Sequence, residues 1–121
     1  GLRQLLGARL TILDIWASWC APCRRENRET LKPVWEKYRS SGLQIVGYSI
    51  DADGAAWRAA IARDGADWPQ ASHLVGDAAP FLGNLRIATI PANFILDGQG
   101  RVVAKNLHGD AMRAFVEAYF R

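Results

Sequence analysis

Cysteine and histidine are scarce in this sequence, which contains two residues of each type. Two cysteines do not make a disulfide-rich scaffold, and they leave the redox compartment of the chain undecided. The two histidines, His73 and His108, stand far apart, so the chain does not offer the four ligands of a structural zinc site at the usual spacing. We therefore expect no metal, and we interpret both histidines as surface or hydrogen-bonded residues.

Long apolar runs and blocks of like charge are also absent. No stretch approaches the ~20 consecutive apolar residues of a membrane-spanning helix, and the opening GLRQLLGARL is too short and too polar for the core of a signal peptide. The net charge is +3, but the basic residues are interleaved with acids. We therefore expect no nucleic-acid partner and no membrane contact by this chain itself.

The composition is that of an ordinary globular protein. Half of the 121 residues are hydrophobic and five are tryptophans, so a core can form without help from a disulfide. No internal repeat, linker or low-complexity segment divides the chain. The length predicts a single domain, residues 1–121.

The first half of the chain predicts a strand, a helix and a second strand. Residues 9–16 and 42–50 are apolar and rich in β-branched residues, and the second run has the pattern of a parallel strand buried on both faces. A helix from Cys23 to about Tyr38 would connect them in a right-handed crossover. Pro33 should kink or divide this helix, because proline removes one backbone hydrogen bond.

The second half of the chain predicts a helix, a hairpin and a closing helix. Asp51 or Asp53 can cap a helix that ends near Gly65, and a short strand and a short helix are expected within DWPQASHL and GDAAPFLGNL. Residues 91–106, PANFILDGQGRVVAKN, predict a β-hairpin. A helix over residues 110–120 would turn one apolar face to the core. That face consists of Met112, Phe115, Val116 and Tyr119.

Both cysteines lie in the segment WASWCAPC, residues 16–23, directly after the first predicted strand. Pro22 suits the first turn of a helix, which places Cys20 at or just before the N-cap, where free N–H groups favour a thiolate. We interpret Cys20 as the nucleophile of a redox pair and Cys23, one turn deeper, as the resolving thiol. Two alternative interpretations of the cysteine pair remain, namely part of a metal site and an inert structural disulfide. A disulfide that closes so short a loop between the cysteines would contribute little entropic stabilisation.

WASWCAPC followed by RRE, the segment IVGYSID and the segment IPANFILDGQGRVV together resemble the thioredoxin-fold thiol-disulfide oxidoreductases of the TlpA/ResA-like family. The resemblance extends from about residue 9 to residue 120. It implies an α/β, thioredoxin-like fold with a central mixed sheet flanked by helices, and a helix and strand inserted between residues 51 and 80. Arg28 stands where the family often has a proline, so we expect the helix kink to be displaced to Pro33.

The resemblance also implies a substrate site. Pro91 matches the cis-proline that lies against the cysteine pair in the family, where the backbone of Ile90 can pair with a bound peptide. Trp16 is expected to belong to the core. A shallow apolar groove beside the nucleophile would be lined by Trp19, Ala21, Pro22 and Ile90.

Two carboxylates flank the cysteine pair: Asp14, six residues before Cys20, and Glu26, three residues after Cys23. Asp14 matches the buried acid of thioredoxins, whose burial raises its pKa and lets it take a proton from the resolving thiol. Glu26 resembles an acid of the ResA-like proteins on the same side of the helix as Cys23. The alternatives are a solvated strand residue for Asp14 and, for Glu26, a surface acid paired with Arg24, Arg25 or Arg28.

These features predict a thiol-disulfide oxidoreductase that acts on disulfide-containing client proteins, as a reductant. No cofactor is expected, because an electron-donor redox protein would recharge the cysteine pair. We expect a monomer in the periplasm or another extracytoplasmic compartment. We also expect a domain excised from a longer precursor and tethered to a membrane through residues outside this chain.

Two other functions compete with this prediction. A thiol peroxidase on the same fold would require a threonine three residues before Cys20, where residue 17 is alanine. A non-catalytic binding module, either a metal carrier or a chaperone-like domain, would use the groove beside Trp19 without turnover.

Overall fold

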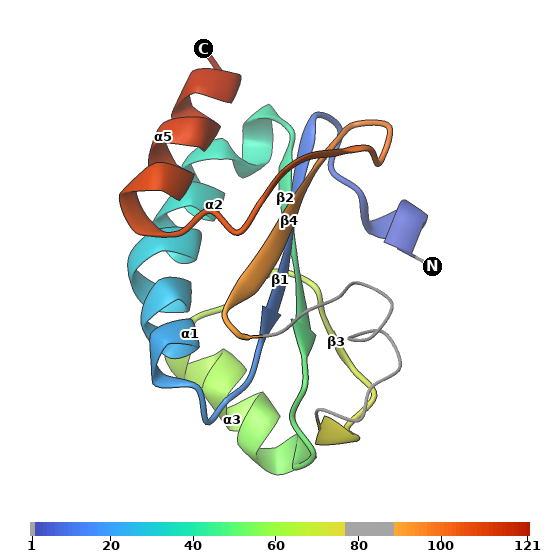
Figure 1. Cartoon of the computed structure of the whole chain (residues 1–121), viewed down its shortest axis with the longest axis vertical. Coiled ribbons are helices and arrows are strands. Elements are labelled where there is room, and N and C mark those ends of the chain that lie inside the picture. The colour runs from blue at the N-terminus through green and yellow to red at the C-terminus, as the bar shows by residue number, and fades with distance from the viewer. Residues whose placement is uncertain (1, 77–88) are drawn as a thin grey trace.

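The computed structural model describes residues 2–76 and 89–121 (Figure 1). Its five-stranded sheet has the strand order β3-β2-β1-β4-β5. Strands β1, β2 and β3 pair in parallel, whereas β4 is antiparallel to both β1 and β5. The strands are β1 (Leu10–Trp16), β2 (Leu43–Ser49), β3 (Gln70–Ser72), β4 (Ala92–Asp97) and β5 (Val102–Lys105).

Helices of three kinds precede, connect and follow these strands. They are η1 (Leu2–Leu5), α1 (Ala21–Glu26), η2 (Asn27–Leu31), α2 (Lys32–Tyr38), η3 (Arg39–Ser41), α3 (Gly54–Asp64) and α5 (Gly109–Tyr119). The predicted first two strands, hairpin and closing helix are confirmed within one or two residues at each end of the strands and the helix. The short helix predicted in GDAAPFLGNL falls, apart from Gly76, outside the described residues.

Strand β1 is the centre of the domain and is buried along its whole length. Leu10 and Ile12 pack in one cluster with residues of α2 and α5, whereas Leu13 and Ile15 belong to a second cluster with the cysteines. Because side chains alternate along a strand, Asp14 continues the face of Leu10 and Ile12. This acid is therefore directed into the interior.

The α-helices described here gather on one face of the sheet. The connections β1–α1–α2–β2 and β2–α3–β3 step across the sheet in the same direction, so right-handed crossovers place their helices on the same side. Arg24 of α1 accordingly bonds Asp64 of α3 at 2.6 Å, and Arg113 of α5 donates to Thr30 of η2 at 3.2 Å. Figure 1 shows α1, α2 and α5 stacked along the sheet, with α3 below them.

The helix that follows the cysteines differs from the prediction, because it begins at Ala21 and has three parts. Segment η2 is a π-helix, in which the N–H of Lys32 donates to the carbonyl of Asn27, five residues back. Pro33 lies in the first turn of α2 directly after it. The wide turn accommodates a residue that cannot donate to the preceding turn, so the prediction that Pro33 divides the helix is confirmed.

Segment 51–80 contains the inserted helix and strand that the resemblance implies, α3 and β3. Asp53 caps α3, since its Oδ1 accepts from the N–H groups of Ala55 and Ala56 at 2.9 and 3.3 Å. Gly65 ends the helix with a φ of +62°. Asp51, the other candidate cap, has a different role.

Candidate active site

The cysteine pair lies where β1 passes into α1. Cys20 is the N-cap residue of α1, with Pro22 in the first turn. A disulfide joins Cys20 to Cys23, with their Cα atoms 5.2 Å apart, and the N–H of Cys23 donates to Cys20 Sγ at 3.3 Å. The first-turn N–H groups and the helix dipole favour negative charge on this sulfur.

The two sulfurs differ in their access to solvent. Cys20 is 7% exposed and Cys23 is 1% exposed, and both belong to one apolar cluster with Trp16. Trp19, next to Cys20, is 67% exposed. Cys20 is thus the more accessible thiol and Cys23 lies behind it, an arrangement that suits a nucleophile and a resolving thiol. Trp16 is fully buried, so its assignment to the core is confirmed.

Asp51 holds the loop that leads to Cys20. The N–H of Ser18 donates to both oxygens of Asp51, at 3.2 and 3.0 Å, and the Ser18 hydroxyl donates at 2.5 Å. A second hydroxyl, from Ser49, also donates to Asp51. The carbonyl of Ser18 accepts from Arg24 Nη1 at 3.1 Å. Both backbone groups of Ser18 are therefore fixed, two residues before Cys20.

Sequence reasoning treated Asp51 only as a possible helix cap. A signal for its actual role was present, because Asp51 follows the end of β2 and Ser18 follows the end of β1. The carboxyl ends of adjacent parallel strands meet at one edge of a sheet, and that edge carries the cysteines here.

Asp14 is 2% exposed, so the alternative of a solvated strand residue is wrong. Burial raises the pKa of Asp14 well above its usual value, and the negative charge of Glu26 raises it further. Among the described residues, no hydrogen bond or ion pair to the Asp14 side chain offsets this effect. The structure thus brings the two predicted carboxylates into electrostatic contact.

Glu26 is also buried, at 9% exposed, and its partners are distant in sequence. His108 Nδ1 lies 2.7 Å from Glu26 Oε1, and the N–H of Gly109 donates to Oε2 at 3.4 Å. The alternative of a surface acid paired with neighbouring arginines is wrong, because Arg24 and Arg28 bind Asp64 instead. His108 is a hydrogen-bonded histidine, one of the two interpretations that the sequence allowed.

The segment before β4 contributes to the same region. The peptide bond between Ile90 and Pro91 is cis, and Ile90 packs against the cluster that contains both cysteines. Ala21 and Pro22 are exposed beside Trp19. A peptide-binding groove formed by these residues stays a prediction.

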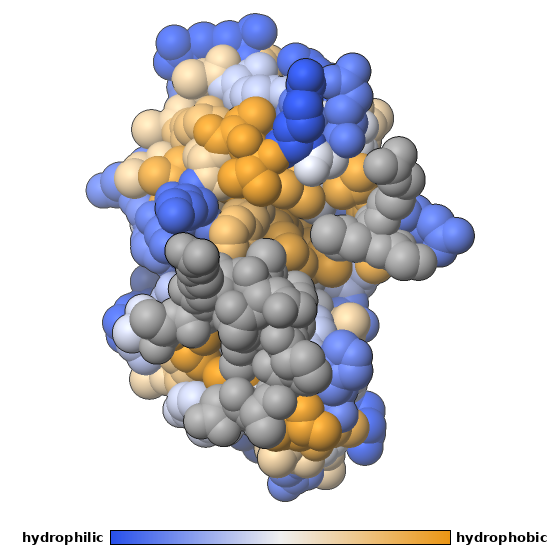
Figure 2. Space-filling view, turned by 45° about the vertical axis from the view of Figure 1, so that its right-hand side comes forward, coloured by the Kyte–Doolittle hydropathy of each residue, from blue (hydrophilic) through white to orange (hydrophobic). Residues whose placement is uncertain are grey.

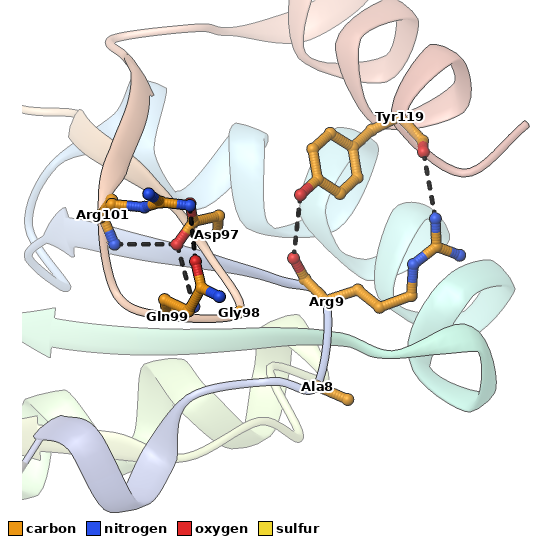
Figure 3. A pocket seen from close by; sticks show the side chains of 7 residues that line it. All are labelled: Ala8, Arg9, Asp97, Gly98, Gln99, Arg101 and Tyr119. Carbon is orange, nitrogen blue, oxygen red and sulfur yellow. Dashed lines mark hydrogen bonds and ion pairs between the residues drawn. The ribbon is translucent and has the colours of Figure 1, made fainter.

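The pocket shown in Figure 3 lies at the other end of the sheet, beside the start of β1. It has a volume of about 410 Å³ and a largely polar lining. Arg9 Nη2 donates to the Tyr119 carbonyl at 3.4 Å, and the Tyr119 hydroxyl donates to the Arg9 carbonyl at 3.2 Å. Arg101 is paired with Asp97 at 2.9 Å. These polar groups of the pocket lining bond to one another, and the pocket lies far from the cysteines.

Several large apolar side chains of the described residues are exposed, namely Leu5, Trp19, Leu74, Val75, Val102 and Val103. Figure 2 shows, on the face it presents, a broad apolar area in the upper half that hydrophilic residues border. Among residues 2–76 and 89–121, no group of three or more His, Cys, Asp or Glu side chains could hold a metal ion. In the same ranges no helix has both the length and the apolar character needed to cross a bilayer.

Sequence comparisons identify relatives over almost the whole chain. A family model described as Redoxin matches residues 2–118. The thiol-disulfide oxidoreductase ResA of Bacillus thuringiensis is 24% identical over 120 residues, which cover 99% of this chain and 66% of that protein. The thiol:disulfide interchange protein HelX of Rhodobacter capsulatus is 26% identical over 103 residues, 84% of this chain and 54% of that protein. The chain thus spans less than two thirds of the length of these curated relatives, narrowly so for ResA.

Solved structures share the fold. The thioredoxin domain of a thiol-disulfide oxidoreductase from Bacteroides vulgatus is 29% identical, with a TM-score of 0.85 over 94% of this chain and 81% of that one. A thiol-disulfide oxidoreductase from Bacteroides fragilis is 30% identical, with a TM-score of 0.83 over 92% of this chain and 81% of that one. The similarity includes the mixed sheet and the helices that surround the cysteine pair.

Proposed function

Since the chain belongs to the redoxin family, as a thioredoxin-fold protein of the TlpA/ResA-like type, we propose that it reduces disulfides of client proteins through Cys20 and Cys23. One observation carries this proposal. Cys20 is the N-cap of α1, and its sulfur accepts a hydrogen bond from the Cys23 N–H. A disulfide joins it to Cys23, which is the more buried of the two cysteines. A dithiol in this position can donate two electrons and close as a disulfide.

The proposed reaction has two exchange steps. The Cys20 thiolate attacks one sulfur of the client disulfide, the client bond breaks, and the released client thiolate takes up a proton. Cys23 then loses its proton and attacks the Cys20 sulfur. The Cys20–Cys23 bond forms while the second client thiolate leaves, so two electrons pass to the client. An electron-donor redox protein returns two electrons to the pair, and no cofactor takes part.

Asp14 is proposed as the base for the second step. Burial and the Glu26 charge raise its pKa, which brings its proton affinity closer to that of a thiol and makes it a better acceptor for the Cys23 proton. Both groups are shielded from solvent, since Asp14 is 2% and Cys23 is 1% exposed. A buried thiol needs such an acceptor because water is excluded from it.

The client is proposed to lie across the exposed edge beside Cys20. Trp19 offers apolar area there, with 67% of its surface exposed. The backbone of Ile90, held before Pro91, would pair with an extended client segment. The groove would consist of Trp19, Ala21, Pro22, Ile90 and Pro91.

We further propose that the protein acts as a monomer outside the cytoplasm, tethered through residues beyond this chain. The resemblance to the TlpA/ResA-like proteins supports this location. Fractionation of cells that express the full-length protein would test the location, and recovery in the cytosolic fraction would contradict it.

Insulin reduction tests the central proposal. With dithiothreitol as the electron donor, the wild-type chain should accelerate insulin reduction, and Cys20→Ser should return the rate to the background. Cys23→Ser, reduced beforehand and then freed of dithiothreitol, should instead accumulate a mixed disulfide with insulin, because Cys20 can attack but no second thiol resolves the product. Background rates for the wild type would contradict the proposal, and tight metal binding in that case would favour a binding module.

A further inference from the structure

The proposed function leaves a proton inside the protein. When Asp14 takes the proton of Cys23, both groups lie in the interior, and Asp14 must lose that proton before the next cycle. The described structure offers a graded path. The Asp14 residue is 2% exposed, and the side chains of Glu26 and His108 are 8% and 38% exposed.

His108 is the ionisable side chain bonded to Glu26 among the described residues. Its Nδ1 lies 2.7 Å from Glu26 Oε1, and its backbone neighbour Gly109 donates to the other carboxylate oxygen. One carboxylate is therefore held from two directions by the segment that starts α5. Nδ1 faces the acid, which leaves Nε2 of a partly exposed ring to exchange protons with water.

The segment that carries His108 is fixed to the strand position opposite Asp14. Asn93 of β4 is the register partner of Asp14 and is fully buried. Its Nδ2 donates to the Leu107 carbonyl at 2.7 Å, and its Oδ1 accepts from the Leu107 N–H at 3.2 Å. The position of His108 relative to the two carboxylates thus depends on one buried amide.

We propose that His108 is a positioning residue that orients Glu26 and passes the proton of the resolving step between the buried carboxylates and water. This inference rests on the proposed function and extends it. Since no hydrogen bond joins Asp14 to Glu26 among the described residues, an intervening water is needed to carry the proton from Asp14 to the Glu26 carboxylate, which leaves Asp14 ionised. Glu26 then protonates His108 at Nδ1, and the imidazolium releases a proton from Nε2 to water. No electron moves in these steps.

Other charged groups surround this path without replacing His108. On η2, Arg28 is paired with Asp64, and the Glu29 carbonyl accepts from Arg113. On α5, Arg113 also pairs with Asp110. On β1, Asp14 is the charged group. In the described part of the chain, neither arginine bonds to Glu26, so His108 is the ionisable side chain that forms a hydrogen bond with it.

The test uses two substitutions of His108 and a matched control. His108→Asn keeps an amide donor near the position of Nδ1 but cannot carry a proton, and His108→Ala removes both functions. His73→Asn alters the other histidine, which bonds Tyr48. The measured quantity is the rate at which Cys23 resolves a preformed mixed disulfide, recorded by stopped flow as a function of pH.

Both His108 variants should slow resolution near neutral pH, by less than the ~100-fold expected from loss of a direct proton acceptor, because His108 acts through Glu26. The pH dependence of the resolution rate should differ between these variants and the wild type, because only the wild type has a side chain at position 108 that can carry a proton. Added imidazole should restore the rate of His108→Ala, because the vacated position is partly exposed. His73→Asn should keep the wild-type profile.

A wild-type rate and profile in His108→Asn would overturn the inference. Slow resolution in His108→Ala without rescue by imidazole, together with a normal His108→Asn, would assign His108 a purely structural role and overturn it equally. If the alanine variant does not fold, the asparagine variant alone decides. A wild-type protein that does not reduce insulin would contradict the proposed function instead. Failure of the inference about His108 can therefore be distinguished from failure of the proposed function.

Discussion

Asp14 and Asp64 are both aspartates and are buried to nearly the same degree, at 2% and 3% exposed. Their pKa values nevertheless shift in opposite directions. Burial raises the pKa of Asp14, and the charge of Glu26 adds to that effect. Burial would also raise the pKa of Asp64, but hydrogen bonds from Arg24, Asn27 and Arg28 lower it below its usual value.

The comparison shows that neighbours, rather than burial alone, decide what a buried acid can do. Arg24 Nε and Arg28 Nη1 lie 2.6 and 3.1 Å from Asp64, so this carboxylate stays charged and ties α3 to α1. For Asp14, the charged group that affects its pKa among the described residues is another carboxylate, that of Glu26. An acid of this kind is suited to exchange a proton.

The largest effect is expected from Asp14→Asn. An amide cannot accept the Cys23 proton, so mixed-disulfide resolution should slow by about 100-fold, measured by stopped flow with Cys20 already linked to a client peptide. The attack of Cys20 on the client should keep its rate, which serves as the internal control. An unchanged resolution rate would remove the distinction between Asp14 and Asp64.

Asp14→Asn should also stabilise the fold at neutral pH. A carboxyl whose pKa is raised by folding binds protons more strongly in the native state, so wild-type stability is lost as pH rises through the folded pKa. The difference between variant and wild type in urea denaturation should therefore grow from about pH 4 upwards and vanish in acid. A less stable variant at neutral pH would contradict the raised pKa.

Asp64→Asn should have the opposite sign. The substitution should reduce the free energy of unfolding by about 2 kcal/mol at pH 7, chiefly through Arg24, because Arg28 is half exposed and regains water. A lowered native pKa stabilises the fold above the unfolded carboxyl pKa, and this stabilisation is lost as pH falls through the folded value. Resolution of the mixed disulfide should stay near the wild-type rate.

Asp51→Asn should give the smallest effect of the three. Asp51 is 1% exposed, but its hydrogen-bond donors among the described residues are hydroxyls and an amide N–H rather than cations. An asparagine keeps one acceptor oxygen, so a loss of about 1 kcal/mol in unfolding free energy is expected. Because Ser18 precedes Cys20 by two residues, the substitution should lower the rate of attack by Cys20 more than the rate of resolution by Cys23. Stopped-flow traces of both steps would separate the two outcomes.

Much of the site was predictable because its signals are local. Cys20 as an N-cap follows from the strand before it and Pro22 after it. The burial of Trp16 and Asp14 fits a central strand without a solvated face, but for Asp14 the expectation came from the family resemblance rather than from a local signal. The hairpin follows from a turn sequence between two apolar runs.

The pairing of the charged groups was not predictable from the same signals. Neighbouring arginines suggested local partners for Glu26, but Arg24 and Arg28 reach Asp64 across the helix packing interface. Glu26 is bonded to His108, 82 residues away. Asp51 and Asp53 had equal local claims to cap α3, and only the contact between strand ends distinguishes them. Such choices depend on tertiary packing, which residue spacing does not encode.

Ionisation of Cys20 tests the account most directly, because the proposed chemistry depends on a thiolate at the start of α1. In reduced Cys23→Ser, thiolate absorbance in the ultraviolet should develop at a lower pH than in free cysteine, whose pKa is about 8.5. The reduced Cys20→Ser variant, which retains the more buried thiol, should ionise at a higher pH. A Cys20 thiol that ionises at or above the value for free cysteine would contradict the account.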